Sequence, residues 1–171
     1  MSLPYPPPAV LKAAGTPVPP TLVLGIGNPL QGDDGLGIWA TEMLASCELP
    51  PGVTIQAAGT PGLGLATWLE GWPRVILVDA VHMGNSPGMW RRFGSEEIKL
   101  IIEDVPLSIH EPGLACGIAL AQALDLLPEE ILLYGVEPGS LNNGQGLSPA
   151  VRRALPELVE DILDELWMRN Q

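Results

Sequence analysis

Short runs of aliphatic residues, each leading into a polar or glycine-rich turn, constrain the fold of this chain more than any other feature. Val75-Ile76-Leu77-Val78 leads directly into Asp79, residues 131–136 lead into Glu137, and Leu22-Val23-Leu24 leads into a turn that begins at Gly25. Runs of this length without polar alternation are typical of strands that are covered on both faces. We therefore expect them to form the interior of a parallel sheet.

Between these runs, apolar residues recur at three- and four-residue steps, which is the period of an amphipathic helix. The pattern predicts helices over residues 36–47, 113–125 and 151–166, a short helix over 63–68, a short strand over 53–57 and an edge strand over 88–93. Ser148 and Pro149 are suited to begin the last helix, and Pro156 predicts a kink or a restart within it. In the first two helices the residues expected to face inward are Leu36, Trp39, Ala40, Met43, Leu44, Cys47, Leu114, Ile118, Ala121 and Leu124.

Strands that alternate with helices predict an α/β protein. We expect a three-layer sandwich, with a mostly parallel central sheet and helices on both faces. The length of 171 residues suits one such domain. Residues 1–20 include seven prolines, a composition that disfavours helices and central strands. We therefore expect a mobile proline-rich tail over residues 1–20 and a single domain over residues 21–171.

The composition is strongly acidic. Twenty Asp and Glu against eight Lys and Arg give a formal net charge of −12, and a surface of that sign repels phosphate backbones, so nucleic acid is not expected as a partner. No stretch has the length and apolarity of a membrane span, and no secretory signal pattern begins the chain. Cys47 and Cys116 form no disulfide framework. We expect both to be inert core thiols in a cytoplasmic protein.

Candidate ligands follow from the topology, because ligands of open parallel sheets bind beyond the carboxyl ends of the strands. Asp33-Asp34 follow the first strand, Asp79 ends the central strand, and His110 lies just before a helix. Asp34, Asp79 and His110 would together offer two carboxylates and one imidazole. That set suits Zn, Ni, Fe or Mn, and the donor chemistry alone does not choose among them. The same rule brings Asn28, Ser108 and Glu137 to this edge.

Each candidate also has a purely structural alternative. Asp33 or Asp34 could cap the following helix, although one aspartate is enough for that. Asp79 could accept hydrogen bonds from a neighbouring loop. A lone histidine is usually not a ligand. His82 could reach the same edge of the sheet, but we expect its side chain to face solvent. His110 gains weight because carboxylates are expected at the same edge of the sheet.

The segment from Gly25 to Gly37 begins like a dinucleotide-binding loop. Its third glycine would fall at position 30, which is Leu30, and the aspartates that follow would repel a pyrophosphate. The chain also lacks a GxSxG serine elbow, and neither cysteine stands in a recognisable nucleophile motif. A nucleotide-dependent oxidoreductase is therefore disfavoured.

A series of motifs resembles the hydrogenase maturation endopeptidases. The motifs, which extend over residues 21–168, are Gly25-x-Gly-Asn-x-Leu-x-x-Asp-Asp-Gly-x-Gly37, Val78-Asp79-Ala80, Ser108-x-His110-x-x-Gly113-Leu114, Gly135-Val136-Glu137-Pro138 and Leu147-Ser148-Pro149-x-Val151. The resemblance implies a protease that removes the C-terminal tail of a nickel–iron hydrogenase large-subunit precursor after nickel insertion. It also implies that the enzyme reads nickel borne by this substrate.

By position, the metal-binding and catalytic residues of that family fall on Asp34, Asp79 and His110. The metal would be the substrate's nickel, with zinc or another divalent ion as a surrogate. Two departures bear on substrate choice: Ala57-Ala58-Gly59-Thr60 lacks a loop acid common in the family, and Gly139 replaces an acidic residue. A metal-polarised carbonyl, an activated water and an aspartate general base all stay open for the hydrolytic step. The alternative function is a non-catalytic nickel-checking chaperone on the same fold.

Overall fold

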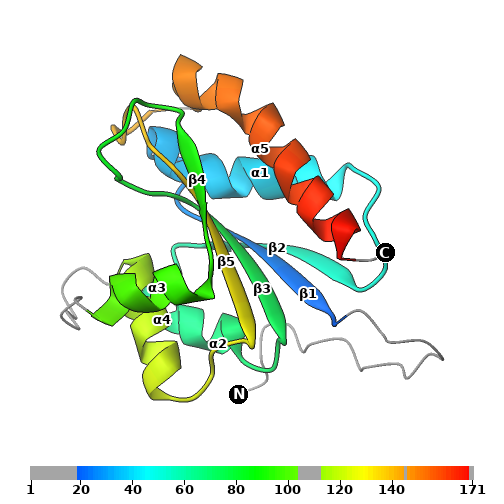
Figure 1. The fold of residues 1–171 in the computed structure, drawn as a ribbon. Helices are drawn as coiled ribbons and strands as arrows, with labels where there is room; N and C mark the ends of the chain where they lie inside the picture. Colours follow the sequence, from blue (N-terminus) through cyan, green and yellow to red (C-terminus); the bar gives the residue numbers. More distant parts are fainter. Residues whose placement is uncertain (1–18, 104–112, 145, 170–171) are drawn as a thin grey trace.

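The computed structural model describes residues 19–103, 113–144 and 146–169. A five-stranded sheet lies at the centre, in the order β2-β1-β3-β5-β4 (Figure 1). Four strands run parallel, and the edge strand β4 runs antiparallel to β5. The strand bounds are β1 (Thr21–Ile26), β2 (Val53–Gly59), β3 (Arg74–Ala80), β4 (Trp90–Phe93) and β5 (Glu130–Val136). The predicted sandwich with a mostly parallel sheet is confirmed, whereas residues 1–18 of the expected tail lie outside the described residues.

Helices cover both faces of the sheet (Figure 1). One face carries α1 (Leu36–Ala45) and α5 (Pro149–Met168), and the other carries α2 (Leu65–Leu69), α3 (Ser95–Glu103) and α4 (Leu114–Ala123). Along β3, Val75 and Leu77 belong to the core cluster beneath α2 and α4, whereas Ile76 and Val78 belong to the cluster beneath α1 and α5. Burial on both faces explains why these strands are aliphatic without alternation.

The helix α1 packs directly on the sheet because two glycines remove side chains from the contact. A Cβ atom on Gly37 would lie 2.3 Å from the carbonyl oxygens of Ile26 and Val78, and one on Gly25 would lie 2.1 Å from the carbonyl oxygen of Gly37. No side chain fits at either position. The close contact fixes the start of α1, together with the short 3-10 helix η1 (Gly32–Gly35) before it, at the carboxyl ends of β1 and β3.

Some sequence-based predictions of side-chain orientation were wrong. Trp39 is 40% exposed and Leu124 is 55% exposed, because Trp39 lies at the margin of the buried face of α1 and Leu124 follows the last residue of α4. Cys116 is buried as expected. Cys47 is only half-buried, since α1 ends at Ala45 and leaves the cysteine in the following turn.

Two helices differ from the predicted pattern. The helix α5 continues through Pro156 without a restart, and Pro156 faces solvent, where the carbonyl group that loses its partner can bond to water. The helix α3 was not predicted. The sequence does mark its start, because Glu97 follows Gly94 by three positions, as the glutamate of a capping box does. In the structure the Glu97 carboxylate accepts a hydrogen bond from the Gly94 N–H at 3.1 Å. No helix in the described ranges has the length and apolarity needed to cross a membrane.

Candidate active site

Asp79 lies at the carboxyl end of β3, in register with Gly135 of β5. The residue is 8% exposed, and its Oδ1 atom accepts a hydrogen bond from the adjacent Ala80 N–H at 2.8 Å. Within the described residues, no loop N–H group bonds to this carboxylate. The described loops therefore do not account for Asp79, which stays a candidate ligand.

Asp34 lies in η1, directly before α1. Its Oδ2 atom accepts a hydrogen bond from the Asn28 N–H at 2.7 Å. This arrangement depends on Gly27, which has a φ angle of +126° and on which a Cβ atom would lie 1.7 Å from the Asp34 carbonyl oxygen. Neither Asp33 nor Asp34 caps α1, because the cap position is Gly35 and no side chain bonds there.

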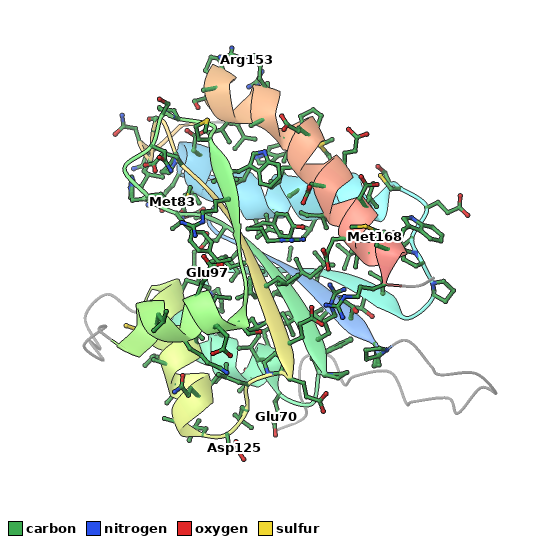
Figure 2. All side chains as sticks on the ribbon, in the orientation of Figure 1. Glu70, Met83, Glu97, Asp125, Arg153 and Met168 are labelled. Carbon is green, nitrogen blue, oxygen red and sulfur yellow. The ribbon has the colours of Figure 1, made fainter. Side chains whose placement is uncertain are left out.

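The two carboxylates share a cavity of about 1000 Å³. Both also line an adjoining cavity of about 360 Å³. Much of the larger cavity is apolar, with walls from β4, α3, α4 and β5 that include Phe93, Ile98, Ile118 and Leu133. The site thus joins an acidic end to an apolar groove. Figure 2 shows Met83, on the segment after β3, near this end of the sheet, whereas Glu70 and Asp125 mark the opposite end.

The environment of Asp79 makes its ionisation difficult. Burial in the protein, and next the negative charge of Asp34, raise the pKa of Asp79 to about 7. The described residues that line the larger cavity include no Lys or Arg. The basic side chain among these described lining residues is His82, so the two carboxylates repel each other in a way that a cation or a shared proton would relieve.

Asp33 has a different role from its neighbour. It is fully buried, and its carboxylate accepts three backbone hydrogen bonds, from Gly139 at 2.7 Å, Ser140 at 2.9 Å and Ser148 at 2.6 Å. Burial alone would raise the pKa of Asp33, but the hydrogen bonds from Ser148, Ser140 and Gly139 outweigh burial and lower it. Asp33 does bond to backbone N–H groups, but not as the helix cap that the sequence suggested, because these groups belong to the segment between β5 and α5.

Glu137 also serves the structure around the site. Its Oε2 atom accepts hydrogen bonds from the Met83 N–H at 2.6 Å and the Asn85 N–H at 3.1 Å, and its Oε1 atom lies 3.3 Å from His82 Nδ1. The hydrogen bonds from Asn85 and Met83 lower the pKa of Glu137. His82 has a mostly exposed side chain, as expected, yet it also lines the larger cavity.

Sequence reasoning located part of this site. Asp34 and Asp79 meet at one cavity as expected, whereas His110 and Ser108 lie outside the described residues. Gln31 and Thr60 also line the cavity and were not predicted to be site residues. Thr60 could have been found from the sheet-edge rule, since it directly follows β2.

The glycine-rich loop does not have free amides for a phosphate group. The Asn28 N–H donates to Asp34, and the Leu30 N–H donates to the Asn28 side-chain oxygen at 3.0 Å. The loop is therefore built to hold an aspartate, which agrees with the argument against a nucleotide site.

The fold and the site define a class of protein: an α/β sandwich with a pair of carboxylates lining a cavity at the carboxyl edge of a parallel sheet. The more specific assignment comes from sequence similarity. A family model described as hydrogenase maturation protease matches residues 39–165. The chain belongs to this family, and it is a hydrolase of the endopeptidase type.

Individual relatives agree with this assignment. The chain is 34% identical over 162 residues to the hydrogenase expression/formation protein HupD of Rhizobium leguminosarum bv. viciae, covering 94% of this chain and 77% of the relative. It is 32% identical over 147 residues to the hydrogenase 2 maturation protease of Escherichia coli, covering 85% of this chain and 89% of the relative. Among solved structures, the hydrogenase maturating endopeptidase HybD from E. coli matches with a TM-score of 0.75 and 31% identity, covering 86% of this chain and 92% of that one.

Proposed function

We propose that this endopeptidase removes the C-terminal tail of a nickel–iron hydrogenase large-subunit precursor after nickel insertion. It would recognise the nickel carried by the precursor through Asp34, Asp79 and His110. The names of the relatives support the class of client, since they describe hydrogenase maturation proteases and endopeptidases. The nickel belongs to the substrate and is not a resident cofactor of the enzyme.

One observation supports cation recognition most directly. Asp34 and Asp79 line the same cavity, and no Lys or Arg stands among its described lining residues. The raised pKa of Asp79, caused by burial and then by the Asp34 charge, is the electrostatic consequence of that pairing. A divalent cation would relieve the repulsion and hold both groups as carboxylates.

The donor set fits nickel and also zinc as a surrogate. Two carboxylate oxygens and one imidazole nitrogen suit borderline divalent metals and leave coordination positions for ligands from the client. His110 would supply the nitrogen. It precedes the cavity-lining residue Gly113 by three positions in the sequence.

The position of Asp79 also suits proton transfer. Without a cation, the Asp79 carboxyl group has a pKa of about 7 and exchanges protons readily near neutral pH. With the cation bound it would be a carboxylate, which is the form that a general base needs. In the hydrolytic step, Asp79 would take a proton from the attacking water and pass it to the leaving amine. A client-borne cation would supply polarisation of a nearby carbonyl group, and it would position the tail next to the aspartates.

The decisive experiment incubates the enzyme with large-subunit precursor that is either loaded with nickel or nickel-free. Mass spectrometry then reports loss of the tail. We expect cleavage of the loaded precursor only. Binding of the loaded precursor without any loss of mass would favour the non-catalytic chaperone, and efficient cleavage of the nickel-free precursor would contradict recognition of nickel.

A further inference from the structure

Two loops beside the acidic end of the cavity form a surface of unusual composition. One is the segment 28–32 after β1, and the other comprises the described residues 139–144 and 146–148 between β5 and α5; together we call them the rim. Neither segment contains a charged residue, in a chain with 28 Asp, Glu, Lys and Arg residues. The exposed side chains of the rim are apolar or carry amides.

The rim presents two leucines to solvent. Leu30 is 70% exposed and Leu141 is 42% exposed. Leu141 and Gln31 also line the cavity that contains Asp34 and Asp79. The exposed apolar surface is therefore continuous with the proposed active site.

The rim is held in one arrangement by several hydrogen bonds. The Gly144 N–H donates to the Leu30 carbonyl oxygen at 3.2 Å, and the Asp33 N–H donates to the Ser140 carbonyl oxygen at 2.9 Å. The buried Asp33 carboxylate binds the second loop at both of its ends, through Gly139, Ser140 and Ser148. A fixed surface loses little conformational entropy when a partner binds, so exposed leucines on it are well placed for recognition.

We propose that the rim is the docking surface for the folded body of the precursor, whose tail enters the adjoining cavity. This inference rests on the proposed function. An endopeptidase that acts near the end of a folded client must contact the client where the tail leaves it, and the rim is the surface at that point. Since the cores of protein interfaces are depleted of charge, the neutral rim fits an uncharged, partly apolar patch on the client and not a basic segment.

The double variant Leu30→Ser/Leu141→Ser tests the proposal with nickel-loaded precursor as substrate. We expect KM to rise by about tenfold or more, because two exposed apolar contacts with the client are lost, and kcat to change much less than KM. Binding of Zn²⁺ alone, measured by calorimetry, should also be unchanged, because neither leucine is a ligand. The control is Leu124→Ser, which alters an equally exposed leucine (55%) at the opposite end of the sheet. It should leave KM as in the wild type.

A second variant keeps the proposal testable if the double variant does not fold. Asn143→Arg keeps both leucines and adds a charge to the exposed part of the rim, and it should raise KM in the same way. An unchanged KM in both rim variants, or an equal rise in the Leu124→Ser control, would overturn the proposal. If the wild-type enzyme itself fails to cut the precursor, the proposed function fails instead, so the two failures are distinguishable.

Discussion

Asp34 and Asp79 line the same cavity, and the charge of Asp34 adds to burial in raising the pKa of Asp79 to about 7. The two residues come from different connections, one after β1 and one at the end of β3. Both residues reach this cavity because β1 and β3 are neighbours in the sheet, with five residues of each strand in register. The electrostatic coupling of this pair leads to measurable consequences.

The first prediction concerns the pH dependence of stability. The folded state holds the Asp79 proton up to a pH of about 7, whereas an unfolded chain releases it near pH 4. The contribution of Asp79 to the free energy of unfolding should therefore fall as pH rises from about 4 to 7. Asp79→Asn should remove this fall. It should stabilise the metal-free protein at pH 8 by about a few kcal/mol, which is the free energy that corresponds to raising the Asp79 pKa to about 7. Urea unfolding at pH 4, 6 and 8 measures the difference; parallel curves for both proteins would contradict it.

The second prediction concerns Asp33, for which the sign is opposite. Its lowered pKa stabilises the folded state above the pKa of an unfolded aspartate, and this contribution is lost as pH falls through the lower folded value. Asp33→Asn turns an acceptor toward three N–H groups into a partial donor and should cost about 1–3 kcal/mol at pH 7. Chemical denaturation checks this value. Asp164→Asn, on the exposed face of α5, is the matched control and should change stability little.

The third prediction is that His110→Ala abolishes tail removal and leaves the fold intact. The reason is the loss of the single nitrogen donor of the proposed set, while the two core clusters are built from other residues. Mass spectrometry of the precursor and the Tm of the variant are the two measurements. Retained processing would remove His110 from the site. The control is His82→Ala, which removes the other histidine of the chain. It should keep tail removal, so that a loss in His110→Ala reflects the position of that imidazole.

The fourth prediction concerns the resting metal content. If the nickel belongs to the client, the purified enzyme should be largely metal-free, and prior treatment with a chelator should not reduce its activity on loaded precursor. Metal analysis of the purified protein and a chelator-treated assay check this. Stoichiometric zinc in an enzyme that loses activity on chelation would instead identify Asp34, Asp79 and His110 as permanent ligands of a catalytic metal.

Much of the fold could be predicted from the sequence. The runs at β1, β3 and β5 were recognisable because strands buried on both faces must be aliphatic, and the sheet-edge rule selected Asp34 and Asp79. Other details could not be predicted. Trp39 and Leu124 fit an apolar helical pattern, but their exposure depends on where each helix ends and on which neighbours cover it.

The sequence by itself determined the class of fold, the family and the candidate aspartates, because these follow from periodicity, composition and motif spacing. Only the tertiary structure decided how adjacent aspartates divide their roles. Asp33 accepts hydrogen bonds from the N–H groups of a segment more than 100 positions away and fixes that segment. Asp34 accepts a hydrogen bond from the Asn28 N–H and lines the cavity together with Asp79. Two neighbouring carboxylates look alike in a sequence. The lowered pKa of Asp33, and the different roles of the two residues, depend on which groups the folded chain brings within hydrogen-bond distance, and packing fixes those distances.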